Sequence, residues 1–278
     1  MTSSPTLAVC SPTGRALYVF CVARVDFLTM IDGTGLDGAD RVQLIPFRDL
    51  VAVVSTVSVN DFCGPVAEAR LKDLAWVGPR ACRHEAVVER VMRSSPILPA
   101  RFATLFSSRE RLEAWLERHH AAISGTLDRV AGLEEWAVKG TLHKQNAEAR
   151  LLAAALERER GTLSPSPGAR YLEEQRIRAT IGQELDIWVK DVCERVVTEL
   201  LVHAVEFRER AVVPGALVAE GIGLLNWAFL VARRTVDDFS TCVQRINGEL
   251  GEQGVVLEVS GPWPPYSFCP PLDLSSLA

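Results

Sequence analysis

The sequence predicts an α+β protein with two domains, and three observations carry that prediction. The chain has 278 residues, whereas one domain usually contains about 100 to 200. Hydrophobic residues make up 48% and charged residues 23%, which is ordinary globular usage. Short β-branched runs and amphipathic helical segments alternate along the chain. We expect a domain of residues 1–140, with a ferredoxin-like sheet and helices, and a domain of residues 141–278, with a long helix and a proline/aromatic tail.

The first domain begins with predicted strands. Residues 16–23 are rich in β-branched and aromatic side chains, which is typical of a buried strand. A run of glycine and aspartate at 32–38 supplies turn residues. Residues 42–47 and 50–59 then read as two further strands, arranged as a hairpin. A sheet of at least these strands is therefore expected in the first domain.

Helices and a closing strand complete the predicted first domain. Apolar residues at helical spacing predict helices at 66–76 and 80–93, separated by Gly78 and Pro79. Two prolines favour extended structure at 96–106. The remaining expected elements are an amphipathic helix at 109–131 with Ser108 as N-cap and Gly132 as C-cap, and a strand at 135–142 that closes this domain.

The second domain is predicted to be built around one long helix. Apolar residues from Ile177 to Leu200 recur every three or four positions, which predicts a helix over 171–210. Three prolines in 261–268 exclude a regular helix or a central strand there, so we expect an ordered extended tail. The other predicted elements are a helix at 144–159, a strand at 227–232, a helix at 236–250 and a strand at 255–260.

Charge and hydropathy exclude several classes of partner. The net charge of −5 argues against nucleic acid, whose phosphates require a basic face. The longest strongly apolar stretch, 224–232, has about half of the roughly 20 residues that a membrane-spanning helix needs. The seven cysteines are scattered and contain no C-x-x-C pair. No membrane span is expected, and a reducing cytoplasm is the simplest compartment.

Catalytic and metal-binding motifs are not found. His84-Glu85 starts like the zinc-protease helix motif, but Val88 stands where the second histidine is needed. Gly221-x-Gly223 lacks the third glycine of a dinucleotide loop. Asp32, Asp37 and Asp40 lack the spacing of a calcium loop. We therefore predict no catalytic residue, no cofactor and no metal site, and thus a protein that is not an enzyme.

Separated segments carry a resemblance to a known family. The most specific are 99–106 (PARFATLF) and 261–268 (GPWPPYSF). In this order along the chain, the segments resemble the gas vesicle protein L and F (GvpL/GvpF) family. The pattern expected for that family has glycine at Ala103 and a larger apolar residue at Ala100. The full set is 17–20 (LYVF), 74–76 (LAW), 84–88 (HEAVV), 99–106, 135–139 (EWAVK) and 261–268.

The resemblance implies an accessory or minor structural protein of gas vesicle assembly. Such a protein would sit at the gas vesicle in the cytoplasm, bind the main hydrophobic wall protein (GvpA) and other gas vesicle accessory proteins, and limit aggregation of the wall protein during vesicle nucleation. Two alternatives stay open: a soluble scaffold for the other accessory proteins, and a small-molecule-binding α+β protein.

Two motif segments supply candidate partner-contact residues, because Arg, Trp and Tyr are frequent interface anchors. The competing interpretation is structural: Arg101 ties down the C-terminal segment, and the aromatic residues of the tail staple the domains. The candidate contacts are Arg101, Phe102, Trp263, Tyr266 and Phe268.

Overall fold

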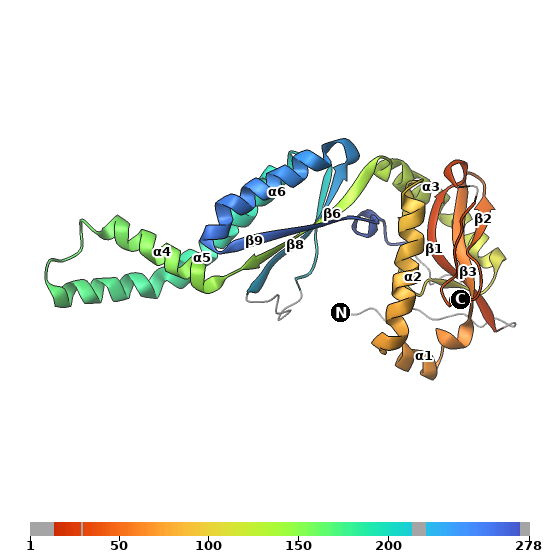
Figure 1. The fold of residues 1–278 in the computed structure, drawn as a ribbon, viewed down its shortest axis with the longest axis horizontal. Coiled ribbons are helices and arrows are strands. Elements are labelled where there is room, and N and C mark those ends of the chain that lie inside the picture. Colours follow the sequence, from red (N-terminus) through yellow and green to blue (C-terminus); the bar gives the residue numbers. More distant parts are fainter. Residues whose placement is uncertain (1–13, 29, 213–220, 273–278) are drawn as a thin grey trace. The chain divides into compact units, whose positions relative to one another are not determined.

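The computed structural model describes residues 14–28, 30–212 and 221–272. Its internal contacts divide the chain into two compact units. Leu133–Pro262 form the second unit, and the first contains the residues up to Gly132 together with those from Trp263 onward. The division differs from the expected boundary near residue 140 in one respect above all: the C-terminal segment returns to the first unit. In Figure 1 the chain is coloured from red at its N-terminus to blue at its C-terminus, so the path can be traced by colour.

The first unit contains a five-stranded sheet in the order β2-β3-β1-β4, with β5 pairing β1. The predicted hairpin is present, because β2 and β3 pair antiparallel with Phe47 opposite Leu50. A bulge between Val19 and Cys21 interrupts the pairing of β1 with β3. The strands are β1 (Arg15–Arg24), β2 (Gln43–Phe47), β3 (Leu50–Ser58), β4 (Ile97–Pro99) and β5 (Leu105–Phe106).

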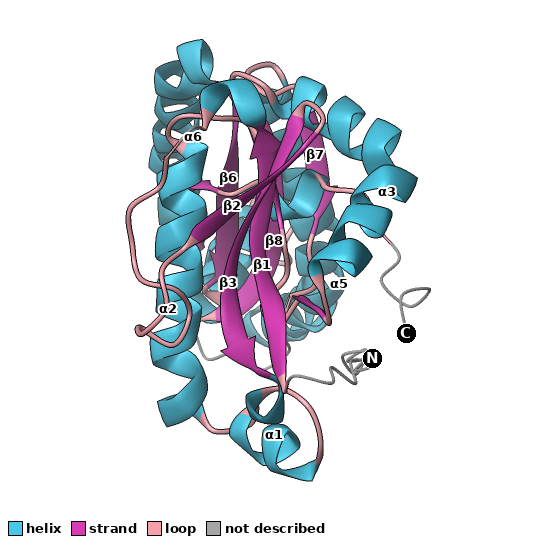
Figure 2. Cartoon of the chain, turned by 90° about the vertical axis from the view of Figure 1, so that its right-hand side faces the viewer, coloured by secondary structure: helices cyan, strands magenta, loops and turns pink. Residues whose placement is uncertain are grey.

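A helix covers each face of this sheet. Figure 2 shows α2 (Leu74–Met92) on one side of β1 and β3 and α3 (Arg109–Val130) on the other. Tyr18 and Phe20 of β1 pack in the core on the α2 side. Val19 and Val22 pack in the core on the α3 side. Because the bulge puts Phe20 and Cys21 in the same core, this strand departs from simple alternation.

The second unit contains a four-stranded sheet in the order β7-β8-β6-β9. If the four strands of this sheet are numbered 1 to 4 along the chain, their order in the sheet is 2-3-1-4. The order β2-β3-β1-β4 in the first unit is the same. The first crossover of the second unit contains two α-helices, α4 and α5, which connect β6 to β7. The described residues between β1 and β2 contain a short 3-10 helix, Val25–Phe27, instead. The elements are β6 (Leu133–Leu142), α4 (Lys144–Glu159), α5 (Pro167–Leu201), β7 (Glu206–Glu209), β8 (Ile222–Ala232), α6 (Val236–Leu250) and β9 (Val255–Trp263).

One core holds the second unit together. Val192, Val196 and Leu200 of α5 and Phe239 and Ile246 of α6 are buried against the inward side chains of the sheet. Within each helix these residues lie four or seven positions apart, as an amphipathic face requires. The structure confirms the α+β class, with mixed helices and antiparallel strand pairing.

Three predicted elements are corrected by the structure. The helices expected at 66–76 and 80–93 are replaced by α1 (Pro65–Arg70) and an α2 that runs through Pro79. Asp73 caps α2 through Ala75 N, so Pro79 lies in its second turn and removes one helical hydrogen bond. The long helix ends at Leu201 rather than Arg210, because β7 pairs with β8.

The third correction concerns β6. This strand was expected to close the first domain, but it pairs with β8 over its whole length, from Leu133 opposite Ala232 to Leu142 opposite Ile222. It is therefore an inner strand of the second sheet, between β8 and β9. Within the part of the chain that the structure describes, no helix is both long and apolar enough to cross a membrane.

Candidate functional site

The motif segments of the first unit converge on one buried cluster. Tyr18 comes from β1, His84 and Glu85 from α2, and Tyr266 from the short 3-10 helix Tyr266–Phe268. Tyr18 is fully buried and His84 is 1% exposed. Segments that lie up to 248 residues apart, from 18 to 266, thus meet at one point. We call these four side chains the tyrosine-histidine cluster.

The tyrosine-histidine cluster is a directed chain of hydrogen bonds. Tyr266 donates its hydroxyl proton to Glu85 Oε1 at 3.0 Å. Its oxygen therefore accepts from His84 Nε2, 3.1 Å away, which places the imidazole proton on Nε2. His84 Nδ1 then accepts from the Tyr18 hydroxyl at 2.8 Å, and Tyr18 in turn accepts from Ala103 N at 3.4 Å.

Burial governs the electrostatics of this cluster. Removal from water disfavours the charged imidazolium, so burial lowers the pKa of His84 to about 4. The same cause raises the pKa of the half-buried Glu85 carboxyl and the pKa values of the Tyr18 and Tyr266 hydroxyls. Near neutral pH, His84 and both tyrosines are therefore uncharged.

Aromatic rings enclose the cluster. Tyr18 meets Phe20 edge-on with ring centroids 5.0 Å apart, and Phe20 stacks on the His84 ring at 5.7 Å. Phe102 contacts both Tyr18 and His84 at 6.1 and 6.2 Å. Such offset and edge-to-face pairs add about 0.5–1.5 kcal/mol each to simple burial. The apolar shell explains why the polar groups inside it satisfy one another.

The loop between β4 and β5 is a tight turn. Thr104 N donates to Arg101 O at 3.1 Å, and Thr104 Oγ1 donates to the same carbonyl at 2.7 Å. Ala103 has φ of 66°, the left-handed value that a type II turn needs at its third residue. The resemblance predicts glycine here, and the turn supplies the reason, since glycine adopts positive φ without a Cβ clash.

Arg101 projects from the first position of this turn. Its side chain is exposed, and among the residues that the structure describes no hydrogen bond or ion pair holds its guanidinium. The C-terminal segment is tied down by a different arginine: Arg129 of α3 donates to Phe268 O. The structural role considered for Arg101 therefore belongs to Arg129.

The five candidate contact residues divide by exposure. Arg101 is exposed, and Trp263 is 41% exposed. Phe102 and Tyr266 are half-buried and belong to the cluster and its shell, while Phe268 is 2% exposed and packs inside the unit. Only Arg101 and Trp263 therefore present substantial side-chain surface to a partner.

Sequence reasoning missed His84 as the centre of the cluster, because it weighed His84 only as a metal ligand. The signal was present in the spacing. His84 stands three, four and seven positions before Val87, Val88 and Val91, the buried residues of α2, so it lies on the helix face that enters the core. Of the described residues, none form a group of three or more histidine, cysteine or acidic side chains placed to hold a metal ion.

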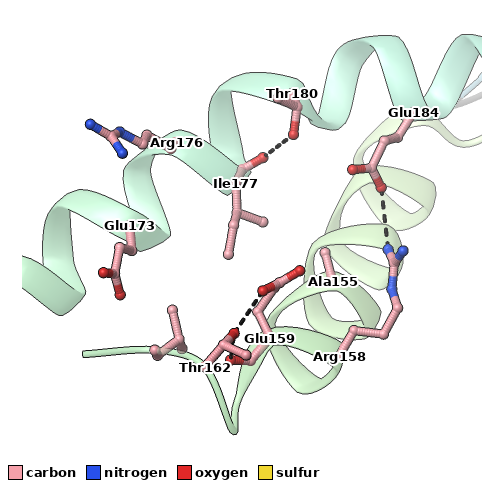
Figure 3. Close-up of a pocket in the computed structure, with 10 residues that line it drawn as sticks. Ala155, Arg158, Glu159, Thr162, Glu173, Arg176, Ile177, Thr180 and Glu184 are labelled. Carbon is pink, nitrogen blue, oxygen red and sulfur yellow. Dashed lines mark hydrogen bonds and ion pairs between the residues drawn. The ribbon is translucent and has the colours of Figure 1, made fainter. Parts of the chain in front are cut away.

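The second unit contains a groove between α4 and α5 with a volume of about 430 Å³. Ala155 and Ile177 face it from the two helices, and Glu184 on α5 pairs with Arg158 on α4 across it at 3.5 Å (Figure 3). Thr162 and Glu159 bond each other at 2.8 Å near its end. Half of the lining residues are charged, whereas most small-molecule pockets are lined mainly by hydrophobic side chains. It consists of Ala155, Arg158, Glu159, Thr162, Leu163, Glu173, Arg176, Ile177, Thr180 and Glu184.

Together, fold and site define a class: an α+β protein of two units with serially repeated strand order, whose motif residues build an internal network that ties chain segments together. Two solved structures share this fold. The gas vesicle protein GvpF from Anabaena sp. PCC7120 gives a TM-score of 0.69 at 18% identity, covering 92% of this chain and 98% of that one. GvpF from Microcystis aeruginosa gives 0.62 at 19% identity, with coverage of 92% and 99%.

Sequence comparisons place the chain more narrowly. The family described as gas vesicle synthesis protein GvpL/GvpF matches residues 16–270. Gas vesicle protein L of Streptomyces sp. (strain CB03234) is 32% identical over 269 residues, covering 92% of this chain and 93% of the relative. Gas vesicle protein F of Haloferax mediterranei is 25% identical over 259 residues, with 91% and 92% covered. This chain belongs to the GvpL/GvpF family.

Proposed function

We propose that this chain is a non-enzymatic accessory protein of gas vesicle assembly that binds the wall protein GvpA and limits its aggregation during vesicle nucleation. The family match over residues 16–270 supports the assembly role. Apolar, β-prone subunits aggregate through unpaired strand edges and exposed apolar surface, so a partner that covers either one delays association. The same reasoning extends to contacts with other gas vesicle accessory proteins.

The observation that carries the binding proposal is the turn that displays Arg101. Its backbone is fixed at both ends, by Ala100 N to Phe20 O at 2.9 Å and by Val19 N to Thr104 O at 3.0 Å. Because the backbone of the turn is already fixed, it loses little conformational freedom when Arg101 binds a partner. Arginine is also among the residues most frequent at energetic centres of interfaces. We therefore assign Arg101 the leading contact role.

The remaining candidate residues take two different parts in this proposal. Trp263, 41% exposed, supplies a second contact surface. Phe102, Tyr266 and Phe268 act from within, because they pack the turn and the C-terminal segment into the first unit. Their substitution would therefore weaken binding through loss of fold rather than through loss of a direct contact.

The test is a pull-down of purified GvpA by the full-length chain and its Arg101→Ala variant. We expect the variant to retain GvpA about tenfold more weakly, in the range of an interface anchor. Arg93→Ala is the matched control, because Arg93 is an exposed arginine of the same unit at the end of α2. This control should bind as the unaltered chain does.

Thermal unfolding of both variants separates contact from folding. Arg101→Ala should unfold within a few degrees of the unaltered chain, since surface substitutions usually change stability by less than about 0.5 kcal/mol. Unchanged retention of GvpA by folded Arg101→Ala would reject Arg101 as a contact. A failure of the unaltered chain to retain GvpA at low and at moderate salt would reject the binding proposal itself.

A second candidate function is a scaffold for other accessory proteins, and the α4–α5 hairpin favours it. Tyr171 and Leu172 on the first turns of α5 are 59% and 62% exposed. The next residue, Glu173, lines the groove between α4 and α5. A charged double substitution, Tyr171→Glu with Leu172→Glu, should then abolish co-purification of accessory proteins while GvpA retention persists. Unchanged co-purification of accessory proteins by the double variant would argue against the scaffold and leave the wall-protein role alone.

A further inference from the structure

We propose that β9 carries a strand-pairing edge whose occupant is β9 of a second copy of this chain, and that Asn247 keeps this edge closed. The strand lies at the end of the order β7-β8-β6-β9, so β6 is the only described strand that pairs with it. It is nine residues long. A long terminal strand presents unpaired N–H and C=O groups, which recruit another strand unless something blocks them.

Asn247 of α6 occupies the middle of that edge. Its Oδ1 accepts from Leu257 N at 2.7 Å, and its Nδ2 donates to Leu257 O at 2.7 Å. A carboxamide offers one acceptor and one donor side by side, as a peptide group does. Asn247 therefore satisfies Leu257 much as a neighbouring strand would. Asparagine is a weak helix former, so helix propensity alone does not account for it in α6.

The direction of the backbone groups decides what Asn247 prevents. In a strand, the N–H and C=O of one residue point to the same side, and those of the next residue point to the opposite side. Val255, Leu257 and Val259 therefore direct theirs toward the open edge. Gly261, with φ of 150°, departs from regular strand geometry, and Pro262 has no N–H.

Pairing with a second β9 is best when Leu257 faces its own equivalent. That antiparallel register opposes Val255 to Val259 on both sides and forms about six backbone hydrogen bonds, two for each opposed pair. Within Val255–Val259, every antiparallel register with more than one bonded pair uses Leu257. Because Asn247 already holds Leu257, only an isolated pair of Val255 residues or of Val259 residues remains, each with about two bonds.

The other described sheet edges are poor pairing partners for different reasons. In a second copy of the chain, β9 is therefore the edge that can pair with β9 of the first. Pro46 stands inside β2 and removes a donor. β4 and β5, which both pair with β1, are only three and two residues long. β7 has four residues and carries Glu206, Arg208 and Glu209, and charged side chains oppose edge pairing. Identical β9 edges are self-complementary around a twofold axis.

The test compares Asn247→Ala with the unaltered full-length chain by sedimentation velocity over a concentration series. We expect the variant to form dimers at concentrations at least about tenfold below any at which the unaltered chain does. Asn226→Ala is the matched control: it also removes a side-chain bond to a backbone carbonyl, that of Ala211, but β8 is an inner strand. This control should not change the association state.

A second substitution locates the contact. Val259→Pro in the Asn247→Ala background removes an outward N–H while leaving the groups directed at β6 in place, so it should restore the monomer. Hydrogen exchange supplies an independent readout, since the Leu257 amide in Asn247→Ala should become more protected as concentration rises. A folded Asn247→Ala variant that stays monomeric, or dimers that survive Val259→Pro, would overturn the proposal.

Discussion

The hydroxyl of Tyr266 donates a hydrogen bond to Glu85 Oε1 at 3.0 Å, although 181 residues separate the two side chains. The same hydroxyl lies 3.1 Å from His84 Nε2. One tyrosine of the C-terminal segment thus closes a polar chain that begins at Tyr18 in the first strand. The relationship gives the tail a structural role in the first unit.

Tyr266→Phe should lower the free energy of unfolding by about 1–2 kcal/mol, because His84 and the half-buried Glu85 each lose a partner. Urea denaturation at neutral pH measures the change. Tyr171→Phe is the control, since Tyr171 is 59% exposed and its loss of a hydroxyl should change little. Equal stability of the two variants would show that the Tyr266 hydroxyl does not hold the tail.

Stability should fall as the pH drops from about 6.5 toward 4. Burial lowers the pKa of folded His84 to about 4, whereas unfolded histidine titrates near 6.5. In that window the unfolded chain binds the extra proton, so acid favours unfolding. From pH 7 to pH 5 the contribution of His84 amounts to about 2 kcal/mol. Glu85, whose pKa is raised by burial, acts with the opposite sign.

The His84 contribution is isolated by comparing the unaltered chain with His84→Gln, which keeps a donor and an acceptor but does not titrate. Denaturation at pH 7 and pH 5 should show a larger loss in the unaltered chain by about 2 kcal/mol. Parallel losses in both proteins would mean that His84 is not the group responsible.

Ala103→Gly should raise the free energy of unfolding by about 1 kcal/mol, since glycine removes the clash that a Cβ suffers at φ of 66°. Thermal or chemical unfolding measures the gain. Ala121→Gly provides a control of opposite sign: Ala121 is exposed within α3, where glycine costs about 1 kcal/mol. A loss of stability at both positions would contradict the turn geometry.

Gly140→Ala should destabilise the second sheet by about 1–3 kcal/mol. A Cβ at this position would lie 2.6 Å from Leu225 Cγ, the side chain opposite it on β8. Gly125→Ala is the matched control, because a Cβ there meets nothing within 4 Å and α3 gains a better helix former. Chemical denaturation should therefore move the two variants in opposite directions.

Local structure was largely predictable from the sequence. The expected helices at 144–159 and 236–250 match α4 and α6 at both ends. Ser108 caps α3 through Arg111 N, and β1 departs by one residue at each end from the predicted 16–23. These features depend on the order of apolar residues and on caps within a few positions, so a short stretch of sequence contains their cause.

The choice of partner for each element was decided only by the tertiary structure. β6 looked the same whether it closed the first sheet or formed the centre of the second, because a strand pattern does not identify the strand it pairs with. β7 read as the end of the long helix until its pairing with β8 was known. His84 became a buried centre only when Tyr18 and Tyr266 arrived from opposite ends of the chain. The sequence therefore determined the local elements and the family, whereas long-range hydrogen bonds and packing determined how those elements combine.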